Sequence, residues 1–406
     1  MKRLLHNIGL LATVQGNSAR GGSAQGEISY QKDAWVLIDG GLISAVGTGT
    51  APAAEEKIDV GGRLVTAGLI DAHTHLIFGG WRQHELGQKL RGVPYLDILA
   101  AGGGILDTVR QTRAATVEAL AEKALPVLSE MLRFGTTTVE AKSGYGLQTE
   151  AELKQLRAVE MLRSMQPVEP VSTFMGGHAL PEEYRNDREG YLRLLCEEMI
   201  PRVAREHLAE FCDVFCEQGV FSAEESERIL RAGAKHGLLP KLHADEIHAI
   251  GGSELAGRLS AVSAEHLIVC PPTGIESMAA GGTVACLLPA TSLYLNAEFA
   301  PARQMVEAGV PVAMATDFNP GSCPCGNMQL VINLGCLKYR LTPEEVLTAV
   351  TLNAAAALNR ADRLGSVECG KQADLVIWDA PDWDFVCYRM GGNSVKNVIK
   401  NGKTVV

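Results

Sequence analysis

Two histidines separated by one residue offer the clearest chemistry in this sequence. His73 and His75 lie in the segment Asp71-Ala72-His73-Thr74-His75, at the end of an apolar run. On a β-strand, residues at i and i+2 point to the same face, so both imidazoles can reach one metal ion. Pairs with this spacing also arise by chance, so the position at the end of the run is what makes this pair informative.

Further residues of the same kind end other apolar runs. His243 and Glu246 end the fifth run along the chain, His266 ends the sixth, and Asp317 ends the eighth. Taken singly, His266 could be a core histidine and Asp317 a helix N-cap. Together, three imidazoles and one carboxylate suit Zn²⁺ or Fe²⁺, whereas Mg²⁺ and Ca²⁺ prefer oxygen ligands. Such an ion lowers the pKa of its water toward neutrality and supplies hydroxide as a nucleophile.

Eight apolar runs of strand length must position these residues. They are Leu69 to Leu76, Thr136 to Ala141, Pro170 to Met175, Cys212 to Cys216, Leu239 to His243, Ser263 to Leu267, Thr283 to Leu288 and Val310 to Ala315. They alternate with amphipathic, helix-length stretches, which predicts βα units with parallel strands. Eight units in about 290 residues are typical of a TIM-like (β/α)8 barrel, whose strands all end at one mouth. An open sheet would be expected to carry G-x-G-x-x-G after its first strand, and that motif is absent there.

Both chain ends are rich in short strands and turns. Asp39-Gly40-Gly41 near one end and Asn401-Gly402 near the other each separate two apolar stretches, which indicates a hairpin. Each end alone is too small to bury a core, so we expect the two to pair into a small β-sandwich domain. The predicted domains are this β-sandwich, residues 1–65 plus 356–406, and a barrel over residues 66–355.

The composition excludes several classes of protein. The chain is 46% hydrophobic and 21% charged, and it has no apolar run long enough for a membrane span. A net charge of -10 without a basic cluster disfavours nucleic acid as a partner. The ten cysteines lack the spacing of a disulfide framework and indicate the reduced thiols of a cytoplasmic protein.

The segments that carry these residues resemble the amidohydrolase superfamily. Residues 68–75, Gly-Leu-Ile-Asp-Ala-His-Thr-His, are similar to its first-strand signature, and His243, His266 and Asp317 match its remaining positions. The fourth strand ends Cys216-Glu217 and offers no lysine for the bridging carbamate of binuclear members. The resemblance therefore implies one Zn²⁺ or Fe ion per chain.

Five segments resemble the imidazolonepropionase family more closely. They are Phe78-Gly79-Gly80-Trp81-Arg82, Lys142-Ser143-Gly144-Tyr145-Gly146-Leu147, Gly176-Gly177-His178, His243-Ala244-Asp245-Glu246 and Thr316-Asp317-Phe318-Asn319-Pro320-Gly321-Ser322. This resemblance implies hydrolysis of the cyclic amide of a small molecule, 4-imidazolone-5-propanoate, to N-formimidoyl-L-glutamate, the third step of histidine degradation. It also implies a homodimer.

For the reaction we interpret four residues as the metal ligands: His73, His75, His243 and Asp317. Glu246 would orient the ring N–H groups and carry a proton to the leaving nitrogen. His266 would steady the developing oxyanion or the water, and Asp317 could share the role of base.

For the substrate we expect Arg82 to pair with the propionate, and Tyr145 and His178 to hydrogen-bond or stack on the flat ring. The other predicted substrate contacts are Tyr95, Glu246, Asn319, Gly321 and Ser322. Simpler interpretations stay open: Arg82 as a surface arginine, Tyr145 and His178 as turn residues, and Asn-Pro-Gly-Ser as an ordinary turn.

Two other functions stay open. A guanine or cytosine deaminase would also carry the His-x-x-Glu of residues 243–246, but it would liberate ammonia, which opening of an imidazolone ring does not. A non-catalytic amidohydrolase-like scaffold would be expected to lack some metal ligands, whereas all four are present here.

Overall fold

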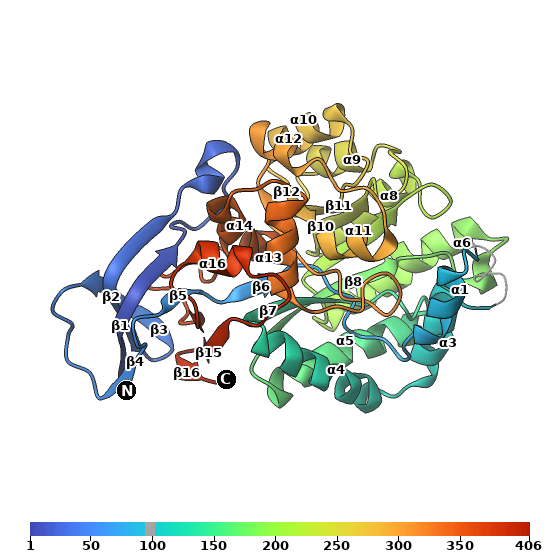
Figure 1. Ribbon diagram of the computed structural model, residues 1–406. Coiled ribbons are helices and arrows are strands. Elements are labelled where there is room, and N and C mark those ends of the chain that lie inside the picture. The colour runs from blue at the N-terminus through green and yellow to red at the C-terminus, as the bar shows by residue number, and fades with distance from the viewer. Residues whose placement is uncertain (94–101) are drawn as a thin grey trace.

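Figure 1 shows the computed structural model of the protein, which describes residues 1–93 and 102–406. Eight parallel strands form one sheet in chain order. They are β6 (Leu69–Asp71), β7 (Thr136–Lys142), β8 (Glu169–Gly177), β9 (Phe211–Cys216), β10 (Leu239–Ala244), β11 (Ser263–His266), β12 (Val284–Leu287) and β13 (Val312–Met314). Each strand falls on one of the eight predicted apolar runs, and the predicted barrel is confirmed.

Contacts beyond the first and last strands close this sheet. An isolated parallel bridge joins the segments that follow β6 and β13. The amide of Asp317 donates to the carbonyl of His73 over 3.0 Å. Nearby, at the end of β6, the Asp71 carboxylate accepts the amide of Thr316 at 3.0 Å and its hydroxyl at 2.6 Å. The closure therefore joins the segment that carries His73 to the segment that carries Asp317.

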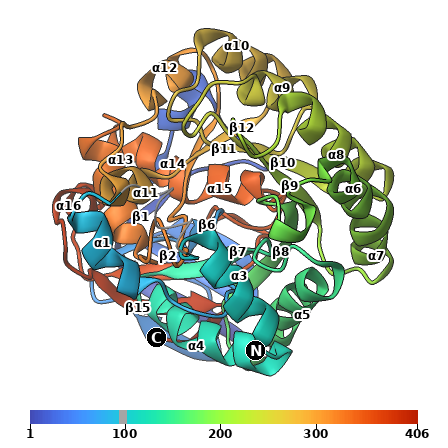
Figure 2. The ribbon, with the colours of Figure 1, turned by 90° about the vertical axis from the view of Figure 1, so that its right-hand side faces the viewer.

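Helices surround the strands on the outside of the barrel (Figure 2). Helix α8 (Ala223–Lys235) shows why such segments form. Ser222 and Glu225 make a capping box at its start, and Ile229 and Leu230 are buried on one face. The other α-helices among the described residues are α1 (Leu86–Leu90), α3 (Ile105–Ala114), α4 (Val117–Arg133), α5 (Thr149–Met165), α6 (Arg188–Arg193), α7 (Ile200–Arg205), α9 (Gly252–Arg258), α10 (Pro272–Gly281), α11 (Pro289–Leu295), α12 (Ala302–Glu307), α13 (Met328–Leu337), α14 (Pro343–Val350), α15 (Leu352–Ala357) and α16 (Trp383–Tyr388). Within the described residues, none of the helices has the length and apolar character that a membrane span needs.

The two chain ends form a separate mixed sheet, on the left in Figure 1. Its strands are β1 (Lys2–Thr13), β2 (Ser29–Asp39), β3 (Leu42–Thr48), β4 (Glu56–Asp59), β5 (Leu64–Ala67), β14 (Leu375–Trp378), β15 (Val395–Lys400) and β16 (Lys403–Thr404). β5 and β14 pair antiparallel, which brings the ends of the chain together as predicted. Both predicted hairpins are present, and their turns use positive φ at Gly40, Gly41, Asn401 and Gly402. The domain limits at 65/66 and 355/356 stay a prediction.

Candidate active site

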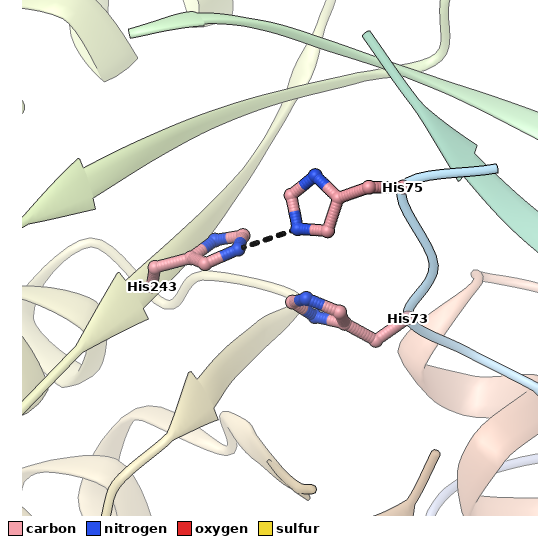
Figure 3. A group of neighbouring side chains, drawn as sticks. All are labelled: His73, His75 and His243. Atoms are coloured by element: carbon pink, nitrogen blue, oxygen red, sulfur yellow. Dashed lines mark hydrogen bonds between the residues drawn. The ribbon is translucent and has the colours of Figure 1, made fainter. Parts of the chain in front are cut away.

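Three histidines converge at the mouth of the barrel (Figure 3). His73 and His75 follow β6, and His243 lies in β10, so the barrel closure described above brings them together. The Nε2 atoms of His75 and His243 are 3.3 Å apart, and the rings of His73 and His243 have centroids 4.6 Å apart. All three side chains are buried. One nitrogen from each ring lies within 4.8 Å of the other two, a spacing that suits ligation of one cation.

Asp317 faces two of these imidazoles. Its Oδ1 lies 3.5 Å from Nε2 of His73 and 3.7 Å from Nε2 of His75. The Nε2 of His73 is buried and makes no hydrogen bond within residues 1–93 and 102–406. Burial opposes the charge of Asp317, but the contact with His73 and the hydroxyl of Thr291 lower its pKa to about 2. Three imidazoles with converging nitrogens and an ionised carboxylate thus fit a divalent metal ion.

Glu246 and His266 stand beside this cluster, 3.7 Å apart between Oε1 and Nδ1. Burial, followed by the charge of Asp317, raises the pKa of Glu246 to about 7. Burial lowers the pKa of His266 to about 4, so its imidazole is neutral at pH 7. Both His266 and Asp317 adopt positive φ, 69° and 55°. Residues other than glycine rarely adopt this backbone conformation, and it often marks a functional site.

The loop of Glu246 is anchored by Glu217, a residue without a predicted role. The Glu217 carboxylate is buried at the end of β9 and accepts the amides of Ile247 at 2.9 Å and His248 at 3.2 Å. Its position at a strand end, in the sequence Cys216-Glu217, is the signal that could have identified it. Glu217 therefore holds the loop that presents Glu246.

Tyr145 and His178 form an aromatic wall next to the histidines. The ring of His178 stacks on that of His75 at 4.8 Å and 18°, and Tyr145 lies 5.3 Å from His178. The Nδ1 of His178 lies 3.0 Å from the carbonyl of Gly144 and can donate to it. Gly144 is required here, since its φ is +111° and a Cβ would lie 2.9 Å from Nδ1 of His178. The structure thus places both predicted substrate residues at the site.

Arg82 lies against the loop that follows Asp317. A Cβ on Gly321 would sit 1.1 Å from Nη2 of Arg82, so the guanidinium rests directly on this glycine. Its Nε and Nη1 are buried and form no hydrogen bond with any described residue. Lys89 donates to the carbonyl of Gly321 over 3.1 Å, which adds a second cation to the same loop. Buried, uncompensated N–H groups on a cation are well suited to an anionic ligand.

Asn319 and Ser322 bond mainly to their own loop. The Oδ1 of Asn319 accepts the amides of Gly321 at 2.8 Å and Ser322 at 2.7 Å, and its Nδ2 donates to the carbonyl of Asp317 at 2.7 Å. These bonds shape the loop under Arg82. Direct contact of Asn319, Gly321 or Ser322 with a substrate stays a prediction, and Tyr95 lies outside the described residues.

A layer of charged side chains beneath the histidines was missed by the sequence analysis. It consists of Glu140, Lys142, Asp213, Lys241 and Glu265, all of them fully buried. A signal was present, because Glu140, Asp213, Lys241 and Glu265 are charged residues within predicted apolar runs and Lys142 directly follows one. Lys241 also stands two positions before His243, on the same face of its strand.

Comparisons with known proteins agree with this architecture. The model of the Amidohydrolase family matches residues 64–405. An imidazolonepropionase of Alkaliphilus metalliredigens is 49% identical over 414 residues, covering 99% of this chain and 97% of that protein. One of Treponema denticola is 52% identical over 377 residues, 91% of each chain. A zinc-bound adenosine deaminase of Xanthomonas campestris, 20% identical, has the same fold with a TM-score of 0.71 over 99% of this chain and 92% of its own.

Proposed function

Because this chain belongs to the amidohydrolase family and, within it, to the imidazolonepropionases, we propose that the mouth of its barrel is the active site of this activity. The reaction opens the ring amide of 4-imidazolone-5-propanoate by hydrolysis and yields N-formimidoyl-L-glutamate, a step of histidine degradation. The observation that carries the assignment of the site is the convergence of three imidazole nitrogens and one carboxylate at that mouth.

We propose that one metal ion per chain, Zn²⁺ or Fe, is held by His73, His75, His243 and Asp317. The family and the zinc-bound neighbour support a metal ion in general, and the donor set supports these two metals over Mg²⁺. When bound, such an ion activates water as a nucleophile at neutral pH and polarises a carbonyl oxygen.

Glu246 is the residue best suited to move protons. In the chain without a metal ion its pKa is about 7, so its carboxylate can accept a proton from water and return it, as a carboxylic acid, to the ring nitrogen that leaves. Asp317, with a pKa of about 2, stays ionised and is poorly suited to hold that proton. This contrast supports Glu246 over Asp317 as the general base. The neutral imidazole of His266 would donate a hydrogen bond to the oxygen on which negative charge develops.

Arg82 is proposed to bind the propionate. Its buried Nε–H and Nη1–H groups can form a bidentate pair with a carboxylate, and the loop of Gly321 supports the guanidinium from below. Tyr145 and His178 would pack against the flat ring, because their own rings already form a wall beside His75.

The direct test supplies enzymatically generated 4-imidazolone-5-propanoate and follows the loss of its ultraviolet absorbance, with metal counted in the same sample. We expect hydrolysis, close to one Zn or Fe per chain, and no ammonia. Release of ammonia would identify a deaminase instead. Absence of both metal and hydrolysis after reconstitution with either metal would favour a non-catalytic scaffold.

We further propose that the chain acts as a cytoplasmic homodimer. All ten cysteines are among the described residues and all are free thiols, which supports a reducing compartment. Light scattering on the purified protein should give twice the chain mass of 43.3 kDa. A monomeric mass would contradict the dimer.

A further inference from the structure

The buried charged layer beneath the metal site contains three carboxylates and two ammonium groups. Glu140 and Lys142 come from β7, Asp213 from β9, Lys241 from β10 and Glu265 from β11, and all five are fully buried. Burying five charges is costly unless each one is paired. Their location, directly below His73 and His243, suggests a role in the metal site rather than in stability alone.

Two of the carboxylates reach the histidines from below. The Oδ1 of Asp213 lies 3.1 Å from Nδ1 of His243 and accepts the backbone amide of His243 at 3.2 Å. The carboxylate of Glu265 contacts Nδ1 of His73. A carboxylate at Nδ1 keeps the proton on that nitrogen, which leaves the lone pair of Nε2 free. The Nε2 atom of His243 is the one that faces the other histidines.

Lys142 joins these two carboxylates. Its Nζ lies 2.6 Å from Asp213, 2.9 Å from Glu265 and 2.8 Å from Glu140. Lys241 instead contacts Glu140 at 2.6 Å and Glu265 at 3.0 Å. Since an ammonium group can only donate hydrogen bonds, Lys142 holds the acceptor Oδ2 of Asp213 toward itself, while Oδ1 accepts the backbone amide of His243. Both oxygens lie 3.1 Å from Nδ1 of His243.

We propose that Lys142 and Asp213 are positioning residues that set the tautomer of His243 and thereby the affinity of the site for its metal ion. This inference rests on the metal site proposed above. It concerns no contact with substrate, so its readouts are metal binding and the protonated nitrogen of His243 rather than turnover.

Asp213→Asn is the informative change, because the side chain keeps its shape and gains a donor. Lys142 attracts the amide oxygen, which turns the NH₂ group toward Nδ1 of His243. An NH₂ group at the Oδ1 position, 3.1 Å from Nδ1, favours an accepting Nδ1 and a proton on Nε2, where the proton blocks ligation. A buried aspartate that orients a histidine behaves this way in serine proteases. We expect nitrogen NMR of the metal-free, histidine-labelled protein to show the Nε2–H form, and competition with a chelator to show zinc binding weakened by about 10- to 100-fold.

The decisive variant is the double change Lys142→Met with Asp213→Asn, which removes one charge of each sign. Without the ammonium group the amide is free to turn its oxygen toward His243. We expect the Nδ1–H form to return and zinc binding to recover to within about threefold of the original protein. The matched control is Lys241→Met with Asp213→Asn, which leaves Lys142 in place and should not recover.

Several results would overturn the inference. One is an Asp213→Asn protein with the original tautomer and unchanged zinc binding, and another is a double variant that binds zinc more weakly than the single one. Thermal unfolding of each variant identifies loss of fold. If Asp213→Asn does not fold, the double variant Lys142→Met with Asp213→Asn must still bind zinc as the original protein does. If the original protein itself binds no zinc or iron, the proposed function fails, which is a separate outcome.

Discussion

Replacing Glu246 by glutamine tests the proton transfer at the site most directly. Glu246→Gln keeps the shape of the side chain and removes its titration. If Glu246 moves the proton between water and the leaving nitrogen, kcat should fall by about 10²- to 10⁴-fold, as for other general acid–base residues. Metal content should stay the same, because Glu246 is not among the proposed ligands. Ultraviolet absorbance of the substrate and metal analysis of the same sample measure both quantities.

The same substitution should stabilise the metal-free protein at alkaline pH. The pKa of Glu246 is raised from 4.5 to about 7 in the folded chain, so between these values the folded state binds more protons than the unfolded one. The free energy of unfolding therefore falls as the pH rises through this window. At about 1.36 kcal/mol per pKa unit, the loss reaches about 3 kcal/mol above pH 7. Glutamine avoids this loss, because it carries no charge at any pH.

Thermal unfolding of chelator-treated protein at pH 5 and pH 8 measures this effect. With about 2.1 cal/mol/K of unfolding entropy per residue over 406 residues, 3 kcal/mol corresponds to a Tm about 4 °C higher for the variant at pH 8. The gain should be much smaller at pH 5, where Glu246 is mostly protonated in the folded chain. Metal must be absent, because a nearby cation would lower the pKa of Glu246. Unchanged turnover would remove Glu246 from the mechanism, and an equal Tm difference at both pH values would refute the raised pKa.

Three further outcomes are expected. Arg82→Met should raise KM by about 10- to 100-fold with kcat within about threefold, because a hydrogen bond to a charged group contributes about 1.5–3 kcal/mol to binding. Gly321→Ala should raise KM in the same way, since its Cβ would displace the guanidinium of Arg82. A change in kcat alone would contradict this role. His75→Ala should lower bound metal to below about a tenth of an ion per chain and abolish hydrolysis, and full metal content would exclude His75 as a ligand. Asp71→Ala leaves the buried amide and hydroxyl of Thr316 unpaired, so it should lower the free energy of unfolding by about 1–3 kcal/mol, and an unchanged Tm would refute the closing role of Asp71.

Local patterns account for the part of the fold that could be predicted. Alternating apolar runs and amphipathic stretches predicted the eight strands from β6 to β13, because burial in a parallel sheet makes each strand apolar over its own length. Asp39-Gly40-Gly41 and Asn401-Gly402 predicted their hairpins, because positive φ is a property of the turn itself. The position of His73 and His75 at a strand end was equally visible.

The loops at the mouth of the barrel were harder to interpret. Asn319 and Ser322 are polar residues of a turn, and the sequence does not say whether their hydrogen bonds go to a ligand or to one another. The structure directs them largely to their own loop, under Arg82. The anchoring of the Glu246 loop by Glu217 likewise depends on β9 and β10 being neighbours in the barrel.

Residue patterns along the chain were therefore enough to predict the barrel, the pairing of the chain ends and several side chains near the mouth. The charges that neutralise one another beneath the histidines become visible only in the folded barrel. Lys142, Asp213 and Glu265 lie on three strands that are far apart in sequence, and the sequence around each charge does not indicate its partner. The closed barrel gives them their partners, since inward-facing residues of different strands share one layer and buried charges are stable only when they are paired there.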